Sequence, residues 1–153
     1  MIRWLFAAVH LLALGVGLGA VWARGQALRH QLDPAGLRRV FYADSWWGIS
    51  ALLWIGTGLV RAFGGLEKGS AYYLGNHLFW AKMSLLVLIL LLELRPMIAL
   101  VRWRIGLARG TQPDTRSAAA FARISFAQAV LVTLMVLAAT AMARGYGVPQ
   151  ADH

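Results

Sequence analysis

Residues 77–94 read HLFWAKMSLLVLILLLEL, and this stretch decides the fold. A helix of about 20 residues crosses the hydrocarbon core of a bilayer, so this stretch is nearly long enough by itself. Its only charged side chains are those of Lys82 and Glu93. In lipid each backbone polar group needs a partner within its own segment, which favours a helix over an open strand. We therefore expect an integral membrane protein.

The composition of the whole chain agrees with this expectation. The 153 residues are 59% hydrophobic and 14% charged, whereas soluble domains carry about 25% charged residues. Fifteen Lys and Arg against six Asp and Glu give a net charge of +9. The basic residues lie between apolar runs, where the positive-inside rule explains them, so a nucleic-acid-binding function is excluded. The chain has no Cys, which excludes disulfides and thiolate metal sites.

Three further apolar stretches lie before and after the first one. The predicted spans cover about residues 2–23, 46–63, 77–103 and 118–143, and Pro96 is expected to kink the third. The first stretch is longer than the apolar region of a usual signal peptide, and we expect it to be a retained helix. The sequence thus predicts an all-α fold, a four-helix transmembrane bundle that forms one domain over residues 1–153.

The orientation of the bundle follows from its arginines. Four lie in the predicted linker between the first two spans, and four more connect the third span to the fourth. Cytoplasmic loops carry the excess of basic residues, so both termini are expected to face outward.

Three ionisable residues, His10, Lys82 and Glu93, lie inside predicted spans, where such groups are functional candidates by default. His10 is either a neutral imidazole bonded to a neighbouring helix or an axial ligand of haem iron. Lys82 either extends its ammonium to the interface or binds a ligand carboxylate. Both lie one to two turns below the outer surface, in one layer with Thr57, Gly58 and Thr140. The small residues of this layer leave room for a flat ligand.

Other polar residues receive simpler interpretations. Glu93 is expected to pair locally with Arg95 or Arg123, while Asp44 and Arg61 are assigned to the interface. His77 lies at or just above the layer of His10, as a second axial ligand or as interfacial polarity. Met135 and Met142 are either sulfur donors or core residues.

Tryptophans and glycines indicate how the helices meet lipid and each other. Six tryptophans lie near span ends, as an aromatic belt at the membrane interface requires: Trp4, Trp22, Trp46, Trp47, Trp80 and Trp103. Trp54 lies deeper and would line a pocket. Gly15 and Gly19 form a G-x-x-x-G pair, which favours close approach of another helix.

Two segments carry a resemblance: AAVHLL at residues 7–12 and FWAKMSL at residues 79–85. The chain resembles an uncharacterised family of bacterial four-helix membrane proteins over nearly its whole length. More remotely, it resembles the HemJ-type protoporphyrinogen oxidases, small four-helix membrane proteins that bind haem b. This resemblance implies a multi-pass protein of the bacterial inner membrane, with His10 on the haem iron and Lys82 as a catalytic residue.

Three functions remain open. A membrane oxidoreductase would hold haem b with His10, His77, Lys82 and Gly58 around it, and would pass electrons from a porphyrin-type substrate to quinone. A proton- or ion-handling protein would use His10, Lys82 and Glu93 as a path. A non-catalytic accessory subunit would pack against a larger membrane complex, and a homo-oligomer is open as well.

Overall fold

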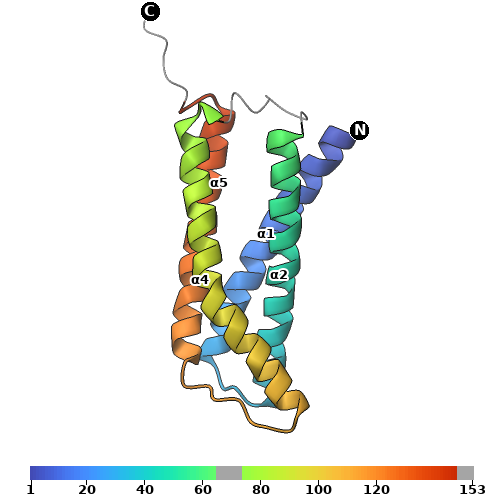
Figure 1. Ribbon diagram of the computed structural model, residues 1–153, viewed down its shortest axis with the longest axis vertical. Helices are drawn as coiled ribbons and strands as arrows, with labels where there is room; N and C mark the ends of the chain where they lie inside the picture. Colours follow the sequence, from blue (N-terminus) through green and yellow to red (C-terminus); the bar gives the residue numbers. More distant parts are fainter. Residues whose placement is uncertain (65–73, 148–153) are drawn as a thin grey trace, which may run out of the picture.

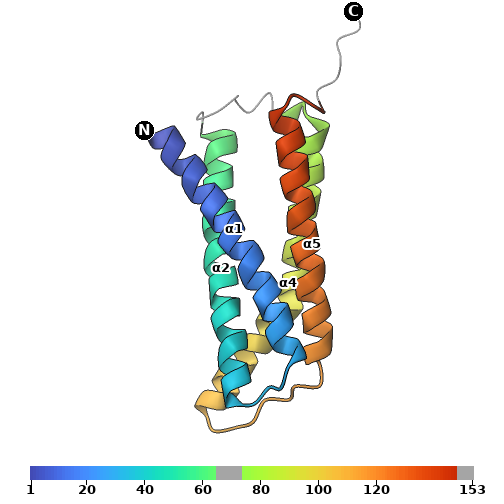
Figure 2. The same ribbon diagram turned by 180° about the vertical axis from the view of Figure 1, so that it is seen from behind.

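The computed structural model describes residues 1–64 and 74–147. In these ranges the chain forms four α-helices, namely α1 (Ile2–Arg29), α2 (Pro34–Phe63), α4 (His77–Ala108) and α5 (Ala118–Ala143). They run alternately up and down, so the start of α1 and the end of α5 lie at the same end of the bundle (Figures 1 and 2). The all-helical, four-helix prediction is confirmed.

Three of the described helices, α1, α4 and α5, are long and apolar enough to cross a membrane. The second helix, α2, is of similar length but less apolar, and it does not meet the same measure. The prediction of apolar spans is therefore confirmed for three helices, and a fourth span at α2 stays a prediction.

Helix α2 begins well before the predicted residue 46, so most of the expected linker is helical. The Asp33 carboxylate accepts a hydrogen bond from the Gly36 backbone N–H at 2.6 Å. Pro34 occupies the first turn, where its missing N–H removes no helical hydrogen bond. Because α1 also continues to Arg29, only residues 30–33 connect the two helices.

The closest helix pairs are α1 with α2, α1 with α5, and α4 with α5. A first apolar cluster in the middle of the bundle includes Val21, Trp47, Ile89, Val132 and Met135. A second, nearer the ends of α1 and α4, includes Leu37, Val40, Leu100, Trp103 and Phe121. Figure 1 shows the C-terminal part of α4, coloured gold, crossing towards α2. Pro96 lies inside this helix and explains the change of direction, because it has no N–H to donate.

Four of the six tryptophans expected in an aromatic belt are exposed, and two are buried. Trp4, Trp22, Trp46 and Trp80 are exposed, as the interface requires. Trp47 and Trp103 are only 4% and 7% exposed, so the belt prediction is wrong for these two. Both face the core because they belong to the apolar clusters of the bundle.

Close packing of α1 against α2 involves Gly17 and not the predicted pair of Gly15 and Gly19. A Cβ at Gly15 or Gly19 would have no neighbour within 4 Å, so neither makes a close contact with another helix of the described residues. A Cβ at Gly17 would lie 3.2 Å from Ser50 Cβ. Gly17 therefore sets the distance between α1 and α2.

Candidate functional site

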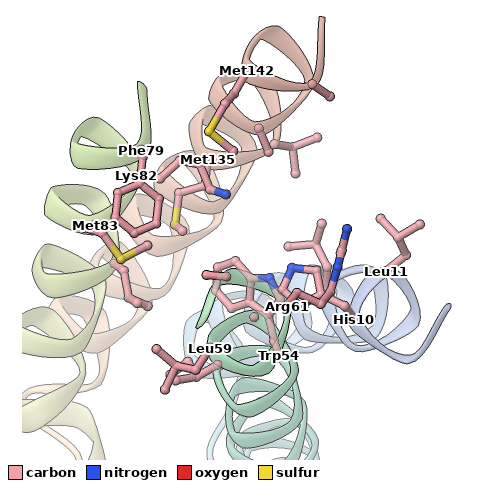
Figure 3. Close-up of a pocket in the computed structure, with 18 of the residues that line it drawn as sticks. His10, Leu11, Trp54, Leu59, Arg61, Phe79, Lys82, Met83, Met135 and Met142 are labelled. Atoms are coloured by element: carbon pink, nitrogen blue, oxygen red, sulfur yellow. The ribbon is translucent and has the colours of Figure 1, made fainter. Parts of the chain in front are cut away.

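A cavity of about 410 Å³ lies between the α1/α2 pair and the α4/α5 pair, at the end of the bundle where α1 begins (Figure 3). Its walls are mostly apolar and include Leu14, Ile55, Leu86 and Val136. A few polar side chains project into this lining. Apolar walls with a few polar groups are typical of small-molecule sites, and the volume lies within their usual range.

His10 is held on the α2 side of the cavity by Thr57. The imidazole Nδ1 lies 2.9 Å from Thr57 Oγ1. This hydroxyl also donates to the Leu53 carbonyl oxygen at 2.6 Å. Because a hydroxyl has one hydrogen and a carbonyl only accepts, we assign the proton of His10 to Nδ1, which donates to Oγ1. In a neutral imidazole with its proton on Nδ1, Nε2 carries no hydrogen, and this is the form of imidazole that binds a metal.

Two residues of α2 fix the position of the His10 ring. A Cβ at Gly58 would lie 3.1 Å from His10 Cε1, so the glycine lets the ring approach the helix. The Trp54 ring lies 6.2 Å from the imidazole, centroid to centroid, and also lines the cavity. The imidazole is therefore oriented by a hydrogen bond, a glycine and an indole.

Two cationic side chains line the same cavity. Arg61 comes from the last turn of α2 and Lys82 from the second turn of α4, and both are partly buried. In Figure 3, Arg61 lies beside His10, and Lys82 lies on the opposite side near Met135. An apolar cavity with two cations suits an amphipathic molecule that carries carboxylates.

Methionines cover the side of the cavity that faces His10. Met83, Met135 and Met142 all line it, and Figure 3 shows them on α4 and α5 across from the imidazole. A thioether is a soft donor that can serve as a haem ligand. Met135 and Met142 are 4% and 8% exposed, so they contribute to the core as well.

The structure brings together most of the predicted layer. His10, Gly58, Lys82 and Thr140 line one cavity, although they come from four different helices. His77 is the first residue of α4, is exposed, and does not belong to this lining. Its backbone N–H donates to the Gly147 carbonyl at 3.0 Å. The structure therefore does not place His77 opposite His10.

A second polar centre surrounds Arg24, whose side chain is fully buried. Its Nη1 lies 2.8 Å from Asp44 and 2.7 Å from Glu93 Oε1, and its Nη2 lies 2.8 Å from Glu93 Oε2. The two contacts with Glu93 form a bidentate ion pair, the geometry in which arginine binds carboxylates best. Asp44 also accepts from Arg104 at 2.9 Å. Two arginines and two carboxylates thus balance in charge.

Neutral side chains complete this centre. Arg24 donates to Ser125 Oγ at 3.0 Å and to Gln128 Oε1 at 2.8 Å. Trp47 Nε1 donates to Glu93 at 3.0 Å. All four described helices contribute, and no buried side-chain nitrogen or oxygen in the described ranges lacks a partner. The centre therefore fastens the helices together.

The Arg24 centre corrects two sequence interpretations. Glu93 pairs with Arg24 and not with Arg95 or Arg123, both of which are exposed. Asp44 has more than an interfacial role, because it lies between two arginines. The sequence did contain a sign of this ion pair. Arg24 directly follows the apolar residues 21–23, and its positive charge could compensate the acidic residues Asp44 and Glu93 near or in other apolar segments.

An apolar layer separates the two centres. Val21, Ile89 and Val132 are at most 2% exposed, and along their helices they lie between the cavity and the Arg24 centre. Glu93 does not line the cavity. The described residues therefore give no continuous polar path from His10 and Lys82 to Glu93.

The cavity residues fit a haem group by their chemistry. An imidazole lies on one side, methionine thioethers lie on the other, and two cationic side chains, of the kind that pairs with propionates, belong to the lining. Within the described residues, no group of three or more His, Cys, Asp or Glu could hold a simple metal ion. The donor set thus suits a macrocycle that supplies most of its own metal ligands.

The comparison with protein families covers almost the entire chain. Residues 2–147 match the family model DUF2214, which is described as a predicted membrane protein. No curated protein and no solved structure matches the chain significantly. The family match and the three long apolar helices both indicate that this is a membrane protein. The chain belongs to the DUF2214 family of predicted membrane proteins.

Proposed function

We propose that this membrane protein is a haem b-binding redox protein, with the haem in the cavity between the α1/α2 and α4/α5 pairs. The observation that supports the proposal most directly is the 2.9 Å contact between His10 Nδ1 and Thr57 Oγ1 in the cavity wall. With the imidazole proton on Nδ1, Nε2 would be the electron-pair donor to the haem iron. A bound haem would supply the electron-transfer chemistry, as cofactors generally do.

The residues of the chain would bind, orient and shield the cofactor. Arg61 and Lys82 would hold carboxylates, and the apolar walls would exclude water. In the proposed reaction a porphyrin-type substrate loses two electrons and two protons, and a membrane quinone takes up both to become a quinol. Lys82 would bind an acidic group of the substrate. The remote HemJ-type resemblance supports this reaction, and α2 is proposed to be the fourth span of a bacterial inner-membrane protein.

An absorption spectrum of the purified protein tests the proposal. Protein from haem-sufficient cells should show a Soret band and reduced b-type bands, because without cysteines the haem is bound non-covalently. His10→Ala should remove or strongly shift the bands. His30→Ala is the matched control, since His30 is exposed at the end of α1, and it should leave the spectrum unchanged.

Two further variants refine the assignment. His77→Ala should also leave the spectrum unchanged, because His77 does not line the cavity. Lys82→Met should retain the bands but bind haem more weakly. A colourless wild-type protein after haem reconstitution would overturn the proposal, and so would unchanged bands in His10→Ala.

A further inference from the structure

A second hollow lies on the lipid-facing side of the bundle, between α1 and α5. This groove, of about 530 Å³, is lined by Gly15, Leu18, Gly19 and Trp22 from α1 and by Ala129, Val130, Thr133 and Leu134 from α5. It is shallow and almost entirely apolar. Gly15 and Gly19 form part of its floor, because no side chain fills the space above them. The groove has the chemistry of a hydrocarbon-binding surface.

Two arginines extend the lining of the groove towards the arginine-rich end of the bundle. Arg29 follows Trp22 by seven residues, and Arg123 precedes Val130 by seven. Seven residues are two helical turns, or about 10 Å, so each arginine lies on the same face of its helix as the groove residue. Both side chains are exposed.

Phe126 connects the groove to the arginines. Its ring contacts the Trp22 ring at 4.9 Å between centroids, and the Arg29 guanidinium lies 5.9 Å from the ring centroid. A Cβ at Gly25 would lie 2.9 Å from Phe126 Cε1, so the glycine lets this ring lie against α1. Along the boundary between α1 and α5, the apolar groove is therefore followed by the Phe126 ring and then by the Arg29 guanidinium.

Among the described residues, neither Arg29 nor Arg123 forms an ion pair with an acidic side chain. In residues 1–64 and 74–147, the ion pairs involve Arg24, Arg104 and Arg116, and none includes Arg29 or Arg123. Two guanidiniums at the end of a hydrocarbon groove match a molecule with an acyl chain and an anionic head. Basic sites between membrane helices bind such lipids through their phosphates.

We propose that the α1/α5 groove is a binding site for an anionic phospholipid of the bilayer. One acyl chain lies over Gly15 and Gly19, and the phosphate lies between Arg29 and Arg123. This site is separate from the cavity of His10, and the inference does not depend on haem binding.

Native mass spectrometry of the detergent-solubilised protein tests this site. The protein is mixed with equal amounts of phosphatidylglycerol and phosphatidylcholine that carry the same acyl chains. We expect a retained phosphatidylglycerol adduct in clear excess, because each arginine near a membrane surface contributes about a fivefold preference for an anionic lipid. Arg29→Gln/Arg123→Gln should remove most of this excess. Arg38→Gln/Arg39→Gln, exposed on α2 at the same end, should retain it.

A second pair of variants tests the hydrocarbon part. Gly15→Leu/Gly19→Leu adds side chains to the groove at positions where a Cβ meets no neighbour within 4 Å, and it should reduce binding of both lipids. Gly48→Leu/Gly56→Leu, at positions of α2 where a Cβ also meets no neighbour, should not. Equal retention of the two lipids by the wild type, or an undiminished excess in the Arg29/Arg123 variant, would overturn the proposal. A lipid-free dimer that the Gly15/Gly19 variant dissociates would assign the groove to a second copy of the chain instead.

Discussion

Arg24 is the residue on which the assembly of the bundle depends most. A charge inside a membrane helix is costly unless it is paired, and Arg24 meets this condition with two carboxylates and two neutral acceptors. Asp44 keeps Arg104 as a partner if Arg24 is lost, whereas among the described residues Arg24 is the one cation that contacts Glu93, and Trp47 and Gln128 give it only neutral hydrogen bonds. Glu93 is therefore the group that a missing Arg24 would leave uncompensated.

Arg24→Met should destabilise the protein by about 3–5 kcal/mol, because it leaves a buried carboxylate without its charge partner. Thermal unfolding in detergent, followed by circular dichroism, measures the effect. Adding Glu93→Gln should recover part of the loss by removing the orphaned charge. Arg95→Met, on an exposed site of α4, is the control and should change little. Equal unfolding temperatures for Arg24→Met and Arg95→Met would refute the stabilising role.

The two polar centres differ in how far the sequence could predict them. His10, Lys82, Gly58 and Thr140 were grouped correctly, because helix direction and distance from the span ends fix the depth of a residue. The partner of Glu93 could not be obtained in this way. Depth leaves the rotation of each helix about its own axis open, and only packing decides whether Glu93 faces Arg24 or the arginines on its own surface.

Among the helices, α1 shows that a G-x-x-x-G motif does not by itself determine which face of a helix packs against another helix. Gly15 and Gly19 are four residues apart and share one face of the helix, whereas Gly17 lies on the opposite face. The structure turns Gly17 towards α2, where Ser50 and Trp47 approach it, and leaves the G-x-x-x-G pair on the lipid side.

The early start of α2 was missed for a related reason. Its first turns are amphipathic and bury Leu37 and Val40, whereas the prediction followed hydropathy alone.

Gly17→Leu should therefore separate α1 from α2. The added Cβ would lie 3.2 Å from Ser50 Cβ and 3.6 Å from the Trp47 ring, and overpacking of this kind costs about 1–3 kcal/mol. The unfolding temperature in detergent should fall accordingly. Gly56→Leu, which meets no neighbour within 4 Å, is the matched control. A Gly17→Leu protein as stable as the control would show that α1 and α2 are not held at this distance.

At the scale of the whole molecule, charge distinguishes the two ends of the bundle. Most exposed arginines of the described residues gather where α1 and α4 end and α2 and α5 begin, and Arg95 lies further inside α4: the gathered ones are Arg29, Arg38, Arg39, Arg102, Arg109, Arg116 and Arg123. The opposite end, which contains the cavity, has Arg3, Arg61 and Arg144. In the loop at the arginine-rich end, a hydrogen bond from Arg116 lowers the pKa of Asp114 to about 2, so this carboxylate stays ionised at neutral pH. Even with that charge counted, the arginine-rich end remains strongly positive.

The positive-inside rule then predicts that the arginine-rich end faces the cytoplasm and that the cavity lies near the outer surface. Because the chain has no Cys, single cysteines can report on this orientation without background. Leu74→Cys marks the cavity end, and Gln31→Cys and Gln112→Cys mark the other; all three positions are exposed. A membrane-impermeant thiol reagent should label position 74 in intact cells, and positions 31 and 112 only after permeabilisation. The reverse pattern would place the cavity on the cytoplasmic side, where its substrate would have to come from the cell interior.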